Sequence, residues 1–259
     1  MPVVGRGLPP VPERLVSIVR GPVFWARSLR CRPDASRNWI VVGMYHRLPA
    51  KDRRGFRQQL DYMATLGDFI TPMQLIGFLT QPEPFEGRYF CITFDDGERD
   101  AYENAVPILV ERGIPATFFV VPDWVSAAFD GGEKCRRHVS WTECGELARA
   151  GFTIGSHSQS HRRLATLEDD VAREQLVESK SEIERSLGIR CDHFASPWGQ
   201  PQSDYNPTRD PDLAKAAGYR SFFTTIRGRA DNGASCWAIP RVRLEPSWSV
   251  SQLPYLFAR

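Results

Sequence analysis

The stretch Tyr89-Phe-Cys-Ile-Thr-Phe-Asp95-Asp96-Gly97 decides which fold this chain is expected to have. Its aromatic and β-branched residues predict a buried strand that ends in two adjacent carboxylates and a glycine. Successive strand residues point to opposite faces, so both carboxylates reach one cleft only where the strand ends in a loop. Gly97 permits the turn that follows. Alone, this pattern is more typical of a strand-ending turn or a helix cap.

A second cluster changes that interpretation. The segment Phe152-Thr-Ile-Gly155-Ser-His157-Ser-Gln-Ser-His161 again runs from an apolar strand into polar residues, with two histidines four positions apart. In a helix or a tight loop both rings can face one point. Two neutral imidazoles and one carboxylate form a donor set that binds Zn²⁺ or a similar divalent ion and leaves positions open. The two clusters together therefore predict a metal site.

These segments resemble the motifs of a known family, the polysaccharide deacetylases (carbohydrate esterase family 4, the chitooligosaccharide-deacetylase homology domain). Thr93-Phe94-Asp95-Asp96-Gly97 is similar to the first motif, His157-Ser-Gln-Ser-His161 to the second, and Phe194-Ala-Ser-Pro197-Trp198-Gly199 to the third. The resemblance extends from about Trp39 to the C-terminus, and the joint set of motifs is specific. It implies a metal-dependent hydrolase that removes an N-acetyl or other N-acyl group from an amino sugar in a polysaccharide, oligosaccharide or glycoconjugate.

The resemblance also implies a role for each matching residue. Asp96, His157 and His161 would hold the metal, and Asp95 would act as the general base. Zn²⁺ suits this donor set best, while Co²⁺, Ni²⁺ and Fe²⁺ also fit it.

The third motif and the segment after it contain candidates for substrate binding. Pro197, Trp198 and Tyr205 are expected to bind substrate, with Trp198 and Tyr205 forming a wall or platform for a sugar ring. The alternative for the two aromatic residues is simple packing, which is the commoner use of such rings.

The chain departs from the commonest family pattern at two places. Ala195 stands where the third motif usually has an arginine that pairs with the base, and no histidine follows it to act as the usual C-terminal acid. Met44-Tyr45-His46-Arg47 resembles an N-terminal motif of the poly-N-acetylglucosamine deacetylases of biofilm matrices, a branch with a permuted order of elements. We therefore expect His46 to be the general acid and Arg241 to replace the missing arginine beside Asp95.

Purely structural roles stay open for His46 and Arg241. His46 could be a strand-end histidine bonded to the backbone, and Arg241 could belong to a structural ion pair. His138 and His193 are both expected to be structural.

Strands alternate with helices along the chain, which predicts a parallel sheet in an α/β fold. The family resemblance implies an irregular (β/α) barrel of about seven parallel strands, with the chemistry at the carboxyl ends of the strands. Strands are expected over 38–47, 89–94, 116–121, 152–155, 191–196, 219–225 and 236–242. Helices are expected over 55–67, 101–112, 140–150, 167–187, 210–217 and 250–258, with a short one beginning at Thr71-Pro72.

Composition favours one soluble globular domain. Hydrophobic residues make up 42% and charged residues 25% of the chain, which is ordinary for such proteins. We expect a catalytic domain over 39–259, preceded by a basic N-terminal extension over 1–38. The net charge of +2, with no basic stripe carrying stacking aromatic residues, gives no indication of nucleic-acid binding. No protein partner is implied.

The N-terminal extension contains arginines at 6, 14, 20, 27, 30, 32 and 37 among apolar residues. Such a basic amphipathic segment is able to lie on an anionic membrane surface, or to pack across the barrel with its arginines outward. No apolar run is long enough to span a membrane, and the extension lacks the apolar core of a signal peptide. We therefore expect a cytoplasmic protein that can reach the inner face of the membrane.

Two other functions stay open at this point. One is an amidase of the same barrel type that acts on C–N bonds outside sugars, and the other is a catalytically silent glycan-binding module. The silent module is disfavoured because a pure binder has no need of Asp95 beside a metal-binding set.

Overall fold

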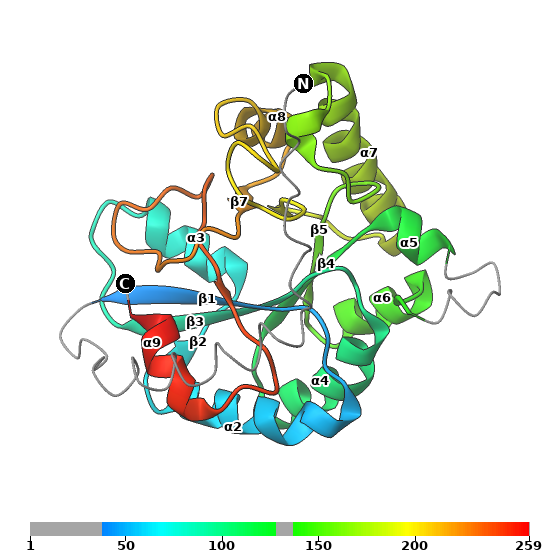
Figure 1. Ribbon diagram of the computed structural model, residues 1–259. Helices are drawn as coiled ribbons and strands as arrows, with labels where there is room; N and C mark the ends of the chain where they lie inside the picture. Colours follow the sequence, from blue (N-terminus) through cyan, green and yellow to red (C-terminus); the bar gives the residue numbers. More distant parts are fainter. Residues whose placement is uncertain (1–37, 128–136, 259) are drawn as a thin grey trace, which may run out of the picture.

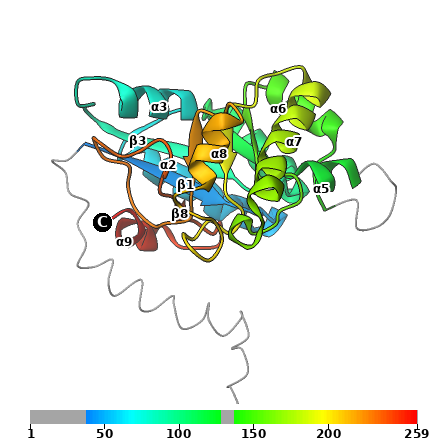
Figure 2. The same ribbon diagram turned by 90° about the horizontal axis from the view of Figure 1, so that it is seen from above.

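The computed structural model describes residues 38–127 and 137–258 of the 259-residue chain. Its strands form one parallel sheet in the order β7-β6-β5-β4-β3-β1-β8, and β2 also pairs with β3. The sheet curls into a barrel-like wall with helices around its outside (Figures 1 and 2). The expected α/β architecture with parallel strands is thus confirmed.

The strands are short and follow the predicted order. Their bounds are β1 Trp39–Tyr45, β2 Asp68–Phe69, β3 Arg88–Phe94, β4 Ala116–Val120, β5 Thr153–Ser156, β6 His193–Ala195, β7 Ser221–Phe223 and β8 Val242–Arg243. The helices are α2 Arg53–Ala64, α3 Pro72–Thr80, α4 Arg99–Arg112, α5 Pro122–Ala127, α6 Trp141–Arg149, α7 Asp169–Leu187, α8 Asp210–Ala216 and α9 Leu253–Phe257. Short 3₁₀ turns are η1 Ala50–Asp52, η3 Leu164–Thr166 and η4 Val250–Gln252. The sequence analysis missed β2 and α5.

Helix ends lie where their capping residues predict them. Thr71 and Ser140 each cap a helix reciprocally with the residue three positions on, at the starts of α3 and α6. α4 and α7 end at Gly113 and Gly188, whose φ angles of 62° and 66° are left-handed. Glycine adopts this conformation without a steric penalty, so it terminates both helices.

Both faces of the sheet are buried. Along β1, Trp39, Val41 and Tyr45 pack into a core under the outer helices, while Ile40 and Val42 belong to a second core inside the barrel. Strands covered on both faces have nearly continuous apolar sequences rather than alternating ones. This explains why β1 and β3 were recognisable as buried strands.

The strand predicted over 236–242 is wrong as a regular strand, because only Val242–Arg243 is assigned to one. Pro240 has no N–H to donate to a ladder, so it interrupts the pairing. The residues before it nevertheless bond to β7: the Ile239 N–H donates to Phe222 O at 2.9 Å, and the Thr224 N–H donates to Ile239 O at 2.9 Å. Since β8 pairs with β1, this segment joins the two edges of the curled sheet.

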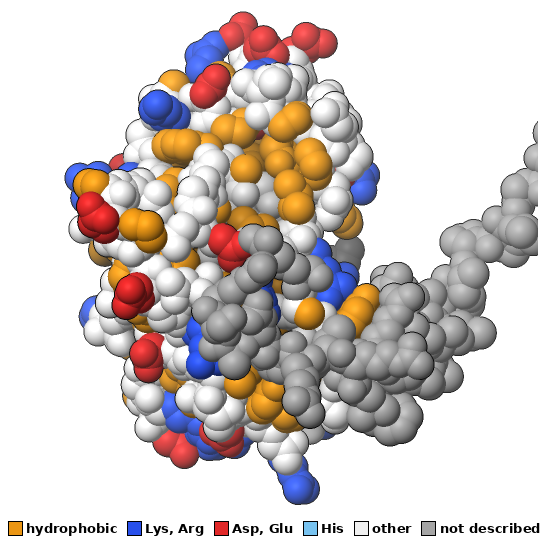
Figure 3. All heavy atoms as spheres, turned by 90° about the vertical axis from the view of Figure 1, so that its left-hand side faces the viewer, with side chains coloured by type: hydrophobic (Ala, Val, Ile, Leu, Met, Phe, Trp, Pro, Cys, Tyr) orange, Lys and Arg blue, Asp and Glu red, His pale blue; other side chains and the backbone are white. Residues whose placement is uncertain are grey.

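The surface and the ends of the chain add three observations. On the face shown in Figure 3, acidic and basic side chains are interspersed rather than gathered by sign. Among the described residues, no helix has the length and apolar character needed to cross a membrane. The basic segment expected within 1–38 lies outside the described residues except for Asn38.

Gln59 ties three parts of the barrel together from the buried face of α2. Its Oε1 accepts a hydrogen bond from the Tyr45 hydroxyl at 2.8 Å. Its Nε2 donates to Glu245 O at 2.8 Å and to Trp248 O at 2.9 Å. The side chain is fully buried, so each of these polar groups depends on it for a partner.

Replacing Gln59 with leucine should therefore destabilise the protein. The change leaves a buried hydroxyl and two carbonyls without this partner, and we expect the free energy of unfolding to fall by about 2–4 kcal/mol. Urea denaturation measures the loss. Gln58→Leu, one residue away and exposed, is the control and should change stability by less than about 0.5 kcal/mol. Equal effects of the two substitutions would contradict this account of Gln59.

Candidate active site

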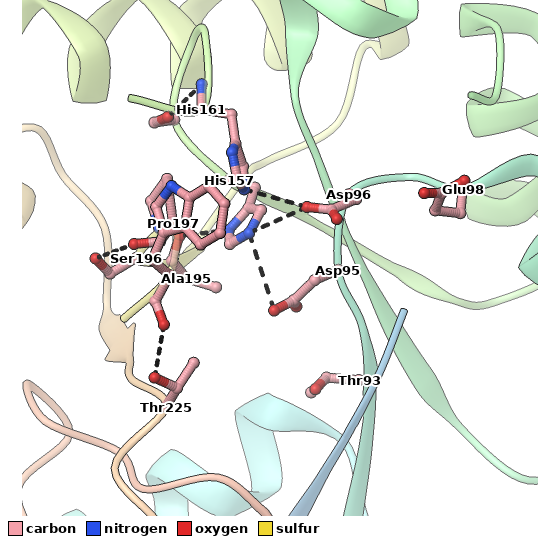
Figure 4. Close-up of polar contacts among 12 residues, drawn as sticks. Thr93, Asp95, Asp96, Glu98, His157, His161, Ala195, Ser196, Pro197 and Thr225 are labelled. Atoms are coloured by element: carbon pink, nitrogen blue, oxygen red, sulfur yellow. Dashed lines mark hydrogen bonds and ion pairs between the residues drawn. The ribbon is translucent and has the colours of Figure 1, made fainter. Parts of the chain in front are cut away.

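Three potential metal ligands converge at the carboxyl ends of β3 and β5. Asp96 follows β3, and His157 and His161 follow β5. Asp96 Oδ1 lies 3.5 Å from His157 Nε2 and 3.3 Å from His161 Nε2, and the ligand atoms of all three residues lie within 4.8 Å of one another. Figure 4 shows the Asp96 carboxylate directed toward the two rings.

The chemistry of these donors fits a divalent cation. Asp96 Oδ1 is buried and has no hydrogen-bond partner among the described residues, which is costly unless a further group satisfies it. His157 Nδ1 lies 2.8 Å from Ala195 O. Because a carbonyl oxygen only accepts, Nδ1 carries the hydrogen and Nε2 presents its lone pair to the centre.

The protonation states suit metal binding as well. Burial lowers the pKa of His157 to about 4, although the nearby Asp95 opposes this shift, so the ring is neutral at pH 7. Burial by itself would raise the pKa of Asp96, but His161 and His157 outweigh burial and lower it. A metal needs deprotonated carboxylate and neutral imidazole ligands, and both are present here.

The backbone around the metal ligands is strained and is fixed by local hydrogen bonds. Asp96, Ser158 and His161 have φ angles of 70°, 64° and 57°, a left-handed conformation that is uncommon outside glycine. The His161 N–H donates to Ser158 Oγ at 3.0 Å, and the Ser158 N–H donates to Ser156 Oγ at 3.2 Å. Such strain persists only where surrounding bonds fix it, and it clusters at functional sites.

Asp95 lies beside this centre in a buried ion pair with Arg241. Arg241 Nη1 donates to Asp95 Oδ1 and Nη2 donates to Oδ2, both at 2.7 Å. Burial would raise the pKa of Asp95, but Arg241, together with His157 and His46, outweighs it and lowers that pKa. Asp95 Oδ2 lies 3.9 Å from His157 Nε2, so an ionised carboxylate faces the metal ligands (Figure 4).

His46 follows β1, so it lies at the same carboxyl end of the sheet as the metal ligands. The Asp95 N–H donates to Tyr45 O at 2.9 Å, which places the residue after β1 next to the residue after β3. His46 is partly exposed, and its side chain makes no hydrogen bond within the described residues. The alternative of a histidine bonded to the backbone is therefore not supported. Its role as general acid stays a prediction.

The three residues expected to bind the sugar differ in their exposure to solvent. Trp198 is 54% exposed, and its ring lies 5.4 Å from that of His161, between the centroids. Pro197 is buried beside His157 in Figure 4, and its contact with substrate stays a prediction. The prediction for Tyr205 was wrong: its side chain is buried in the core, and its ring packs 5.1 Å from that of Phe222.

Sequence reasoning missed two residues next to the metal ligands. His138 was expected to be structural. Its Nδ1 atom lies 3.0 Å from Asp96 O, and its ring is 4.7 Å from that of Trp124. Trp124 in turn lies 4.8 Å from the ring of His161. Both residues belong to the connection after β4, which leaves the sheet between β3 and β5. That position in the strand order was the signal that could have found them. His193, by contrast, is buried and bonds to Ser221 Oγ at 2.9 Å.

Comparisons with known proteins agree with this geometry. A family model described as polysaccharide deacetylase matches residues 83–222. The protein YxkH of Bacillus subtilis is 28% identical over 221 residues, which cover 82% of this chain and 74% of that protein.

Solved structures resemble the fold over most of its length. The structure of IcaB from Ammonifex degensii superposes with a TM-score of 0.71 at 27% identity, covering 85% of this chain and 97% of that one. The Streptococcus pyogenes deacetylase PplD, in complex with acetate, superposes with a TM-score of 0.72 at 22% identity, covering 86% of this chain and all of that one. At 22% identity, the likeness to PplD supports the fold alone.

The contacts of His138 generate a prediction about metal affinity. His138→Ala removes the bond to Asp96 O and the ring beside Trp124, so Zn²⁺ binding should weaken by about 10–100-fold. His138→Asn keeps an N–H donor near the position of Nδ1 and should restore most of the affinity. Competition with a chromophoric chelator measures the dissociation constant. His193→Ala, which removes a buried histidine elsewhere, is the control; equal weakening in this variant would show a general loss of stability instead.

Proposed function

The chain belongs to the polysaccharide deacetylase family, and we propose that it removes the N-acetyl group from a 2-acetamido sugar of a glycan or glycoconjugate. Members of this family are hydrolases that act on amide bonds. The observation that carries the proposal is an ionised, buried Asp95 facing the cluster of Asp96, His157 and His161. This arrangement places a base directly beside a metal site.

In this proposal Asp96, His157 and His161 hold a divalent cation. Metal dependence is typical of the family. Two imidazoles and a carboxylate suit Zn²⁺ best, and Co²⁺, Ni²⁺ and Fe²⁺ also fit them. A divalent cation at such a site polarises a carbonyl oxygen and lowers the pKa of a coordinated water.

Asp95 is the proposed general base. Arg241 uses one lone pair of each carboxylate oxygen, and a carboxylate has about four acceptor positions in total. Oδ2 therefore keeps a position free toward His157, where it can take the proton of an attacking water. Arg241 fixes the direction of that oxygen and keeps the carboxylate ionised.

His46 is the proposed general acid. Expulsion of the amine requires a proton on the sugar nitrogen, and the ring of His46 follows β1 beside Asp95 without a competing hydrogen bond among the described residues. Burial raises the pKa values of Asp95 and Asp96, and His46 helps to lower them, after larger lowering effects of Arg241 and His157 on Asp95 and of His161 and His157 on Asp96. A base and an acid on neighbouring strand ends allow proton transfer on both sides of one amide.

Trp198 is the proposed wall for the sugar ring. Arg163 stacks on it, with the guanidinium carbon 4.6 Å from the ring centroid, and Asp204 holds Arg163 through a 2.9 Å ion pair. The indole is therefore supported from one side while much of it stays exposed next to His161. An aromatic face fixed beside the reacting centre can pack against the apolar face of a sugar.

The buried Asp95–Arg241 pair also weighs against a silent glycan-binding module. Removing two charges from water carries a desolvation penalty that a stable fold does not need. In this proposal the pair is buried because it positions the catalytic base beside the metal ligands. The cytoplasmic location and the contact of the N-terminal extension with a membrane stay predictions of the sequence.

A metal and acetate assay tests the proposal. Wild-type protein should contain about one divalent ion per chain and release acetate from N-acetylglucosamine oligomers. Asp96→Asn should lose both the metal and the activity, since it removes an anionic ligand. Asp95→Asn should keep the metal while kcat falls by about 10²–10⁴-fold. Metal-free wild-type protein that still binds the oligomers would instead support the silent module, and release only from sugar-free amides would support the amidase.

Replacing His46 with alanine tests the proposed acid. Because His46 is outside the set of ligands, kcat should fall by about 10²–10⁴-fold with the metal content unchanged. Measurements of kcat and of bound metal on the same preparation distinguish this from a structural effect. Loss of metal in proportion to activity would exclude the acid role.

A further inference from the structure

A cavity of about 730 Å³ lies at the rim of the barrel, outside the metal centre. It is formed by η1, the first turns of α2 and the loop 246–250, and it is called the rim cavity below. Its lining residues are Lys51, Asp52, Arg54, Gly55, Gln58, Asp61, Pro246, Ser247, Trp248, Ser249 and Val250. The volume lies within the range of small-molecule sites.

The rim cavity is at the same end of the barrel as the metal centre. β8 pairs with β1 so that Met44 lies opposite Arg243, and the Leu244 N–H donates to Met44 O at 2.8 Å. Continuing this register brings Glu245 level with His46, one residue before the cavity begins at Pro246. The two loops that line the cavity are thus continuations of the segments that carry His46 and Arg241 (Figure 1).

The walls of the rim cavity are fixed by close backbone contact. A Cβ on Gly55 would lie 2.1 Å from Pro246 O, so α2 and the loop approach as closely as a glycine allows. One turn along α2, Gln59 bonds to Glu245 O and Trp248 O. The cavity is therefore preformed, which reduces the ordering needed when a ligand binds.

Several polar side chains around the rim cavity lack a partner, although not all of them do. Asp61, which lines the cavity, pairs with Arg112 at 3.0 Å, and Arg57 on the same helix pairs with Glu111 at 2.7 Å. Within the described residues, the side chains of Lys51, Arg54 and Gln58 have no hydrogen-bond or ion-pair partner. Lys51 and Arg54 can therefore donate hydrogen bonds to a ligand, Asp52 can accept them, and the Gln58 amide can do both.

We propose that the rim cavity is a saccharide subsite that binds a sugar unit of the same glycan whose acetamido group is in the metal centre. Trp248, half-buried against the core, provides an aromatic wall. Donors and acceptors of both charges surround it, which matches a neutral ring bearing many hydroxyl groups better than a phosphate or another strongly charged ligand. This inference rests on the proposed deacetylation and extends it by placing a second sugar-binding position between η1, α2 and the loop 246–250.

Substrate length is the variable that tests the rim cavity. In wild-type protein, KM for N-acetylglucosamine oligomers should fall from the disaccharide to the hexasaccharide as the chain becomes long enough to fill the cavity. The double variant Lys51→Ala, Arg54→Ala should raise KM for the hexasaccharide by roughly 5–10-fold, about the effect of one or two lost hydrogen bonds. Its kcat, and its KM for the disaccharide, should match the wild type.

Matched controls separate this effect from charge and folding. Arg173→Ala, Arg190→Ala removes two exposed arginines near α7 and should leave KM unchanged at every length. Trp248→Ala should act like the first double variant; if it unfolds, the lysine and arginine substitutions still decide the question. A KM that does not depend on length, or a hexasaccharide KM unaffected by the rim substitutions, would overturn the subsite.

Calorimetric titration distinguishes failure of the subsite from failure of the proposed reaction. In an Asp95→Asn background, whose turnover is expected to be too slow to consume the ligand during a titration, the hexasaccharide should bind roughly 5–10-fold more weakly once Lys51 and Arg54 are replaced. That loss would support the subsite even if no acetate were released by the wild type. Equal binding with and without the rim substitutions would reject it, whatever the outcome of the acetate assay.

Discussion

The buried ion pair between Arg241 and Asp95 is the interaction on which the rest of this structure depends. The Arg241 guanidinium donates to both Asp95 oxygens and, through Nε, to Thr224 O at 2.8 Å. These contacts connect the ends of β3 and β7 to the segment that leads into β8, and the bond from Arg241 Nε to Thr224 O joins the two edge strands, β7 and β8, of the curled sheet. Desolvating both groups is tolerable only because every bond has good geometry. The same contacts that close the barrel therefore direct the base toward the metal ligands.

Much of the fold and of the ligand set could be predicted from the sequence, because the signals involved are local. An apolar run ending in Asp95-Asp96 indicates a strand end, and Gly113 indicates a helix end, without knowledge of any partner. The segment 236–242 was mispredicted because Pro240 removes a donor in the middle of an apolar run. Tyr205 was misassigned because sequence does not tell a ring packed on Phe222 from one facing solvent. His138 was missed because its contact with Asp96 joins residues on different connections.

The ligands themselves show why part of the site is invisible in sequence. Asp96 and His161 both adopt left-handed backbone, which is uncommon outside glycine. Asp96 O contacts the His138 ring from another connection, and the His161 N–H bonds to Ser158 within its own loop. Trp124 packs between the rings of His138 and His161, so the connection after β4 supports the loops that follow β3 and β5. The metal ligands thus depend on three neighbouring strand ends, although only two of these carry a recognisable motif. Positions of this kind emerge from strand order rather than from local pattern.

The conformation of Trp198 gives the most direct indication of how substrate approaches. Its backbone is left-handed at φ 61°, Thr225 Oγ1 donates to its carbonyl at 2.6 Å, and a Cβ on Gly199 would lie 2.7 Å from Thr225 N. These constraints hold a large apolar ring in water beside His161, where burial would otherwise be favoured. The exposed ring is on the side of the site formed by the loop after β6, and the rim cavity is on the side formed by the loops after β1 and β8. A site that extends in both directions from the reacting centre accommodates sugar units on either side of the acetamido group, which favours attack within a glycan chain.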